Sequence, residues 1–138
     1  MRTGRLTALM RAGLAIPAFV GELVGKNLWK VREPFEYHVG RYPSEEVIKV
    51  PVGFRTDFAS VPRIFWPIIS PVDEHGKAAA LHDYLYAEGI YTRKRSDEIF
   101  LEALEVLGVS KWKRNTMYFM VRTFSFYSWW RCRHGFRK

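Results

Sequence analysis

The chain has 138 residues, 48% hydrophobic and 16% aromatic, which excludes a disordered protein and predicts one domain with a real core. Its single cysteine, Cys132, excludes an internal disulfide framework and a cluster of thiolate metal ligands, and no apolar run reaches the roughly 20 residues of a membrane span. The net charge of +8 lies in residues 111–138, which hold eight Lys/Arg and no acid, whereas residues 1–110 hold 14 of each sign.

Residues 1–27 begin with a basic end and continue with apolar residues, a pattern that imitates a secretion signal. Arg11 interrupts the apolar stretch, and Pro17 and Glu22 weaken what remains of it. We therefore expect an N-terminal amphipathic helix over 4–27, kinked at Pro17, and neither a cleaved signal nor a transmembrane segment.

Residues 28–55 alternate apolar and charged side chains, and Gly40, Pro43 and Ser44 supply a turn in the middle. This alternation is typical of a β-hairpin or small antiparallel sheet. Residues 53–71 contain several prolines and aromatic residues, which favours a loop.

Three helices are expected after the loop, over 77–88, 93–107 and 111–130. Gly89 and Gly108 are suited to end the first two, and Ser110 is suited to cap the third. The predicted fold class is α+β, with a small antiparallel sheet or β-hairpin packed against three to four helices. The predicted organisation is the helix of 1–27, one α+β domain over 28–130 and a basic tail over 131–138.

Two segments carry specific motifs: residues 53–63 read GFRTDFASVPR, and residues 82–86 read HDYLY. With the neighbouring Val50-Pro51 and Arg95-Ser96-Asp97, they resemble a family of short tailed-phage and prophage proteins with no agreed activity, over residues 35–128. The resemblance implies a late-gene role near virion assembly or lysis.

A second pattern resembles calcium-dependent secreted and bacterial phospholipases, which carry His-Asp-x-x-Tyr on one helix and a later Asp on an antiparallel helix. His82, Asp83 and Tyr86 match this string, and Asp97 follows 14 residues after Asp83. The resemblance implies that His82 is a general base, that Asp97 holds its ring, and that Tyr86 supports them. It also implies calcium bound by Asp83 and by Asp57 of the Thr56-Asp57 pair.

Each of these residues also has a structural interpretation. His82 can be a buried core histidine bonded to Asp97 without turnover, and Asp57 can cap the turn that contains Ser60. Arg63 can form a buried bridge with Asp83 or Asp57. A cluster of acids and a histidine indicates function only statistically, so both interpretations stay open. Thr56, Ser60 and Arg63 are supporting candidates in either one.

The C-terminal segment mixes aromatic residues with cations, and Trp129, Trp130, Arg131 and Arg133 are the candidate partner-binding residues. Trp, Tyr and Arg are the usual hot-spot residues of protein interfaces, so other virion proteins are the first expected partner. A membrane surface and single-stranded nucleic acid are the alternatives.

The leading functional prediction is a minor virion, tail-associated or assembly component of a phage, located in the particle or in the host cytoplasm during infection. The first alternative is a calcium-dependent hydrolase or lipid esterase with a His82–Asp97 dyad, and calcium is then the one expected cofactor. The second alternative is a nucleic-acid-binding accessory protein that uses the basic C-terminal segment.

Overall fold

The computed structural model describes residues 21–25, 28–40, 43–56, 64 and 76–134. Within them the chain forms five short strands and four helices, which confirms the predicted α+β class. The strands are β1 (Gly21–Gly25), β2 (Leu28–Val31), β3 (Phe35–His38), β4 (Val47–Val50) and β5 (Arg55–Thr56). The helices are α2 (Gly76–Glu88), α3 (Arg93–Val106), α4 (Lys111–Phe124) and α5 (Phe126–Arg133).

The predicted hairpin is the antiparallel pair of β3 and β4. Phe35 pairs with Val50 and Tyr37 with Ile48, and all four side chains are buried. On the opposite face Glu36 pairs with Lys49, and both point to solvent. The alternation of apolar and charged residues in the sequence therefore places one face of this pair on the core.

A second sheet has the order β1-β2-β5, and both pairings are antiparallel. The expectation of a helix through residue 27 is wrong at residues 21–25, which form strand β1; residues 1–20 lie outside the described part. Glycine at both ends of this stretch is a poor helix former, and β2 offers an edge that the stretch can pair with. The sheet also brings Thr56 of β5 beside helix α2.

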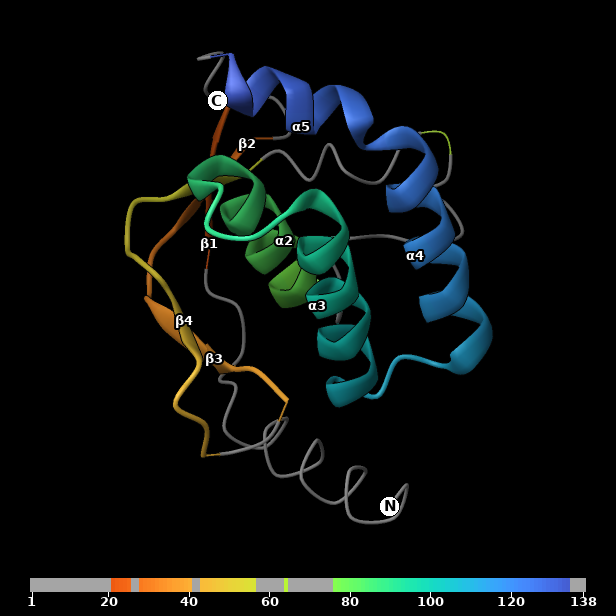
Figure 1. The fold of residues 1–138 in the computed structure, drawn as a ribbon. Coiled ribbons are helices and arrows are strands. Elements are labelled where there is room, and N and C mark those ends of the chain that lie inside the picture. Colours follow the sequence, from red (N-terminus) through yellow and green to blue (C-terminus); the bar gives the residue numbers. More distant parts are fainter. Residues whose placement is uncertain (1–20, 26–27, 41–42, 57–63, 65–75, 135–138) are drawn as a thin grey trace.

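The helices form a layer beside the strands, with α2 and α3 antiparallel in the middle and α4 on the far side of α3 (Figure 1). The side chain of Thr92 caps α3 by accepting a hydrogen bond from the Arg95 amide at 3.1 Å. Gly89 and Gly108 follow α2 and α3 in left-handed conformations, with φ of 65° and 81°, as their positions in the sequence predict.

The expected helix over 111–130 is two helices that meet at Ser125. The Ser125 hydroxyl bonds back to the Val121 carbonyl one turn earlier, a bond that bends helices, and it also contacts Tyr86 of α2. From this joint α5 turns across the end of α2 (Figure 1). Residues 131–133 are therefore the last residues of α5, where a tail was expected.

None of the helices in the described residues combines the length and the apolar character needed to span a bilayer.

Candidate functional site

Helices α2 and α3 bring His82 and Asp97 together in the interior. His82 Nε2 lies 2.6 Å from Asp97 Oδ1, and neither side chain is exposed to solvent. Tyr86 lies one helical turn after His82 and donates its hydroxyl to the same oxygen of Asp97 at 2.6 Å. The structure thus joins three residues that the sequence placed in one cluster.

The second oxygen of Asp97 faces cations from α3 and α4. Arg122 Nη1 donates to Asp97 Oδ2 at 2.8 Å, and Arg93 Nη1 lies 3.7 Å from it. Burial alone would raise the pKa of Asp97, but the hydrogen bonds from His82, Tyr86 and Arg122 and the attraction of His82 outweigh it. The pKa of Asp97 therefore lies below its usual range, and the group is a carboxylate at neutral pH.

The charge of Asp97 determines which nitrogen of His82 carries the proton. A carboxylate only accepts hydrogen bonds, so Nε2 of His82 must be the donor in this pair. In the neutral ring Nδ1 is then the basic nitrogen. A carboxylate that fixes the tautomer in this way is the arrangement that a histidine general base needs.

Ser125 extends the hydrogen-bond chain to the joint of α4 and α5. Its Oγ lies 2.7 Å from the hydroxyl of Tyr86. Because Tyr86 gives its only proton to Asp97, the single proton of the Ser125 hydroxyl serves both the Val121 carbonyl and the Tyr86 oxygen. Burial, followed by the hydrogen bond to Asp97, raises the pKa of Tyr86, so the phenol stays protonated.

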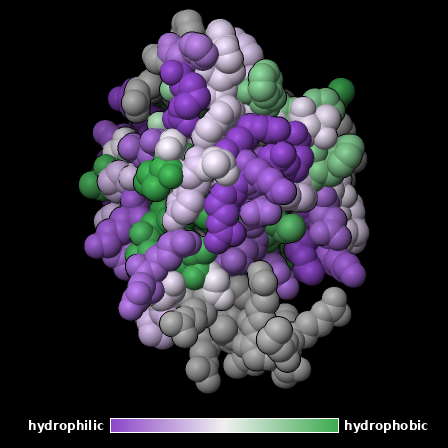
Figure 2. Space-filling model, in the orientation of Figure 1, coloured by the Kyte–Doolittle hydropathy of each residue, from purple (hydrophilic) through white to green (hydrophobic). Residues whose placement is uncertain are grey.

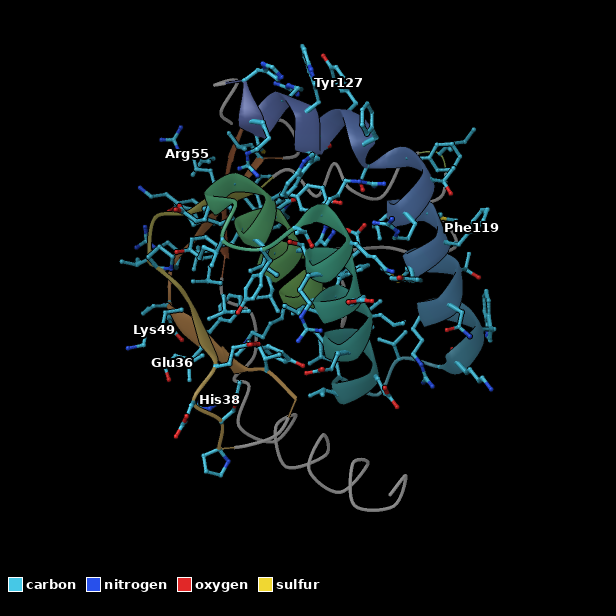
Figure 3. All side chains as sticks on the ribbon, in the orientation of Figure 1. Glu36, His38, Lys49, Arg55, Phe119 and Tyr127 are labelled. Atoms are coloured by element: carbon cyan, nitrogen blue, oxygen red, sulfur yellow. The ribbon has the colours of Figure 1, made fainter. Side chains whose placement is uncertain are left out.

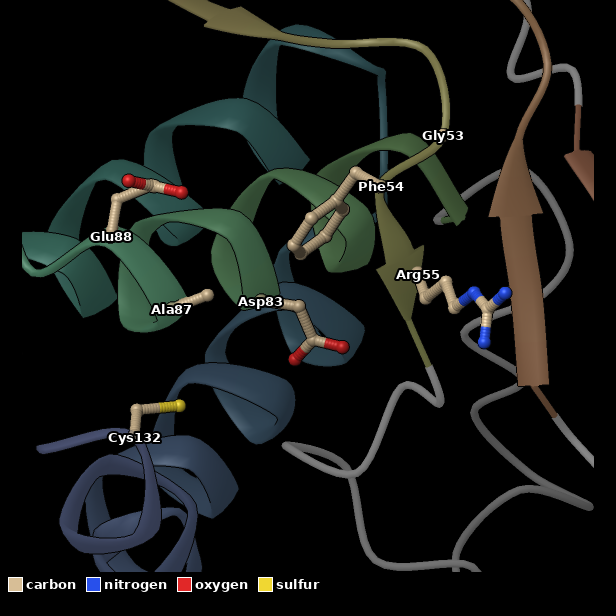
Figure 4. A pocket seen from close by; sticks show the side chains of 7 residues that line it. All are labelled: Gly53, Phe54, Arg55, Asp83, Ala87, Glu88 and Cys132. Carbon is tan, nitrogen blue, oxygen red and sulfur yellow. The ribbon is translucent and has the colours of Figure 1, made fainter. Parts of the chain in front are cut away.

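Asp83 lies on α2 beside the dyad and is almost fully buried, at 2% exposure. Its Oδ2 accepts a hydrogen bond from the Thr56 hydroxyl of β5. Asp83 also lines a pocket of about 250 Å³ between β5, the end of α2 and α5. In Figure 4 Asp83 projects from α2 and Cys132 from α5, while Arg55 is turned towards the neighbouring strand. The remaining lining residues are Gly53, Phe54, Ala87 and Glu88.

Three predicted site residues, Asp57, Ser60 and Arg63, lie outside the described residues. Among the residues that are described, no three His, Cys, Asp or Glu side chains gather closely enough to hold a metal ion. Calcium takes six to eight oxygen ligands, and Asp83 brings one carboxylate. The described residues alone therefore do not make up the predicted calcium site.

The four predicted partner-binding residues all lie on α5, but they differ in what they contact. Trp129 packs its ring edge-on against Tyr86, with centroids 5.1 Å apart. Arg133 stacks over Trp129 and donates to the backbone carbonyl of Tyr86 at 2.7 Å. Trp130 is 41% exposed and lies against Tyr127, and Arg131 also lies over the Tyr127 ring. Trp129 and Arg133 thus fasten α5 onto α2.

Sequence reasoning missed Ser125, Arg122 and Arg93 as members of the cluster. Arg93 precedes Asp97 by four residues on one helix, and this spacing is a usable signal for an ion pair. Arg122 and Ser125 reach the cluster only through the packing of α4, and no local pattern marks them.

Residues 29–121 match the family model described as "Protein of unknown function (DUF1353)". The chain belongs to this family. The DUF1353 match spans the strands from β2 onward, α2, α3 and most of α4, and so it includes His82, Asp83, Tyr86 and Asp97. Membership confirms the expectation of a family without an assigned activity.

One relative is the "Uncharacterized protein y4jT" of Sinorhizobium fredii, 36% identical over 77 residues. The matched stretch covers 54% of this DUF1353 chain and 23% of that protein, so the likeness spans about a quarter of the relative's length. No solved structure matches the chain.

Proposed function

We propose that the protein hydrolyses a carboxylic ester with His82 as its general base. The observation that carries the proposal is the buried His82–Asp97 pair, in which Tyr86 and Arg122 also donate to the same carboxylate. Three helices, α2, α3 and α4, thus converge to hold one carboxylate against one ring nitrogen. The pocket lined by Asp83, which follows His82 in the chain, is the proposed place for a small acyl group.

In the proposed reaction Nδ1 of His82 removes a proton from a water molecule as its oxygen attacks the ester carbonyl. The carbon–oxygen bond to the leaving alcohol then breaks, and the alcohol takes the proton back from the imidazolium. Asp97 stabilises the imidazolium throughout and does not itself take up the proton. Tyr86 and Arg122 hold Asp97 in its ionised form.

Calcium is the cofactor implied by the phospholipase resemblance, and when bound it would polarise the ester carbonyl. Asp83, at the pocket wall beside the Thr56 hydroxyl, is the described residue that would bind it. Asp57 is the second predicted ligand. The described residues do not provide all the oxygen ligands that calcium needs, so calcium binding is a matter for the experiment below. The proton transfers are assigned to His82 alone.

The test is hydrolysis of phosphatidylglycerol vesicles and of a soluble short-chain 4-nitrophenyl ester, each with calcium and with a chelator. The decisive variant is His82→Asn, which removes the base and keeps a polar group of similar size. His38→Asn is the matched control, because His38 lies on β3 and bonds the Ser44 amide instead of Asp97. Circular dichroism and thermal melting establish that each variant is folded.

We expect the wild type and His38→Asn to hydrolyse one or both esters, and folded His82→Asn to lose at least about a hundredfold in rate. Activity that survives in His82→Asn would overturn the proposal. So would a folded wild-type protein that hydrolyses neither ester with or without calcium, and His82 would then be a structural histidine.

The phage-particle role and the nucleic-acid role stay predictions, because neither the family description nor the relative's name speaks of them.

A further inference from the structure

The outer sides of α4 and α5 expose large aromatic rings, whereas the Phe, Tyr and Trp residues of the other described segments are buried or partly buried. These exposed residues, here called the aromatic face, are Trp112, Phe119, Phe124, Phe126, Tyr127 and Trp130. Phe119 and Tyr127 point away from the body of the molecule on α4 and α5 (Figure 3). Figure 2 shows one group of apolar side chains at the upper right, where α4 meets α5, and a second, more strongly apolar group at the left of the same view. Such a concentration of apolar surface marks an interaction site.

Cations accompany these rings. The Lys113 ammonium lies 5.8 Å from the centre of the Trp112 ring, and the Arg131 guanidinium lies 5.7 Å from that of Tyr127. No acidic residue occurs in α4 or α5. The face is therefore both apolar and positively charged, and each of these cations is held at the level of an exposed ring.

Two basic residues of the same helices do not contribute to this face. Arg122 is bound to Asp97, and Arg133 is bound to backbone carbonyls of α2. Of the four other basic residues of α4 and α5, Lys113 and Arg131 are the two whose charges lie over rings of the aromatic face, and Arg93 of α3 lies over Phe126.

The shape of the aromatic face distinguishes between two possible ligands, single-stranded nucleic acid and a lipid surface. Proteins that bind single-stranded nucleic acid stack its bases inside a positively charged groove. The aromatic face is instead the outer, convex side of two helices that bend at Ser125 (Figure 1). A convex surface of exposed rings and cations fits a deformable phase with anionic head groups, because the rings can enter its interfacial region while Lys and Arg contact the charges.

We propose that the aromatic face binds the surface of an anionic lipid bilayer. The interaction does not depend on hydrolysis, because none of its residues belongs to the His82 cluster. Helix α5 nevertheless carries the aromatic face on one side and Cys132 of the pocket wall on the other. Binding through this face therefore brings the pocket close to the bilayer.

The test is co-sedimentation of the full chain with vesicles of equal parts phosphatidylcholine and phosphatidylglycerol, compared with phosphatidylcholine alone. One variant, Phe126→Ser/Trp130→Ser, removes two rings, and another, Lys113→Gln/Arg131→Gln, removes the two cations. The matched control is Val52→Ser/Ile90→Ser, because Val52 and Ile90 are 60% and 64% exposed but lie outside α4 and α5.

We expect the wild type and the control to bind the mixed vesicles. Loss of the two cations should weaken binding about 25-fold, at about fivefold per cation, and loss of the two rings at least about tenfold. Binding should also fall when salt is raised from about 0.1 M to 1 M, which shortens the Debye length from about 10 Å to about 3 Å.

Wild-type protein that stays in the supernatant would overturn the proposal, as would ring and cation variants that bind like the control. Absence of vesicle binding together with tight, salt-sensitive binding of single-stranded DNA would assign the face to nucleic acid instead. The His82→Asn protein should bind vesicles like the wild type, so this result is independent of the outcome for hydrolysis.

Discussion

Replacement of Lys77 by methionine should stabilise the protein at neutral pH. Lys77 lies in the first turn of α2 and is only 5% exposed, and its ammonium has no hydrogen-bond partner in the described part of the chain. A positive charge in the first turn also opposes the helix dipole. Methionine keeps an unbranched side chain of similar length and removes the charge.

The size of the effect follows from two opposing terms. Burial lowers the pKa of Lys77 from its usual 10.5 to about 8, although Glu33 partly opposes the shift. At about 1.4 kcal/mol per pKa unit, this costs the charged folded form about 3 kcal/mol. The ammonium lies 4.7 Å from the centre of the Phe35 ring, a cation–π contact that returns about 0.5–2 kcal/mol. The burial term is larger, and Lys77→Met should gain about 1–3 kcal/mol.

The sign of the pH dependence distinguishes this cause from improved packing. Below pH 8 Lys77 is charged in both states and the full cost applies. Between about pH 8 and 10.5 the unfolded chain binds more protons than the folded chain, so the wild type gains stability as the pH rises. The advantage of the Lys77→Met variant should therefore shrink over this range.

The assay is urea unfolding of wild type, Lys77→Met and Lys111→Met at several pH values between 6.5 and about 10. Lys111 is the matched control, because it also begins a helix but is exposed. A Lys77→Met variant that is less stable than wild type at pH 7, or whose advantage is the same at every pH, would refute the reasoning.

Three further predictions concern the site and its supports. Asp97→Asn should lower the free energy of unfolding by about 3–5 kcal/mol near neutral pH, because Arg93 and Arg122 lose their buried anionic partner. Because the folded pKa of Asp97 is lowered, this loss should shrink as the pH falls below about 4, and a pH-independent loss in urea unfolding would contradict the ion-pair account. Gly89→Ala should cost about 0.5–1.5 kcal/mol more than Gly108→Ala, since both have positive φ but only at Gly89 would the new Cβ displace the Arg133 guanidinium from its hydrogen bond to the Tyr86 carbonyl; equal losses in thermal unfolding would show that this contact is unimportant. Calorimetric titration with calcium should give heat for wild type and none for Asp83→Asn, and identical titrations would exclude Asp83 as a ligand.

The parts of the fold with a strong local pattern could be predicted from the sequence. The strands β3 and β4 alternate apolar and charged residues. Helices α2 and α3 are each followed by a glycine, Gly89 and Gly108, in the left-handed conformation that favours glycine. The predicted proximity of His82, Tyr86 and Asp97 is confirmed, because two antiparallel helices joined by a short turn must place these residues opposite each other.

The remaining features depend on contacts between distant segments. Strand β1 exists because β2 offers it a pairing edge, which outweighs the amphipathic pattern of its residues. The break at Ser125 arises from a hydroxyl that bonds both its own helix and Tyr86. Arg122 is one of the eight Lys and Arg residues of the segment 111–138, and nothing in the sequence distinguishes it from the others. Only the packing of α4 on α3 shows that Arg122 pairs with Asp97.

The hydrogen bonds of Asp97 also determine how the molecule opens. The Asp97 carboxylate binds His82 and Tyr86 of α2, and it pairs with Arg93 of α3 and Arg122 of α4. Through Tyr86 it is also linked to Ser125 at the start of α5. Helices α2, α3 and α4 cannot separate from one another without exposing the Asp97 charge, and α5 is attached to α2 by the contacts of Ser125 and Arg133 with Tyr86. In amide hydrogen exchange the four helices should therefore open as a single cooperative unit with one common free energy, while the exposed ends of the strands exchange earlier.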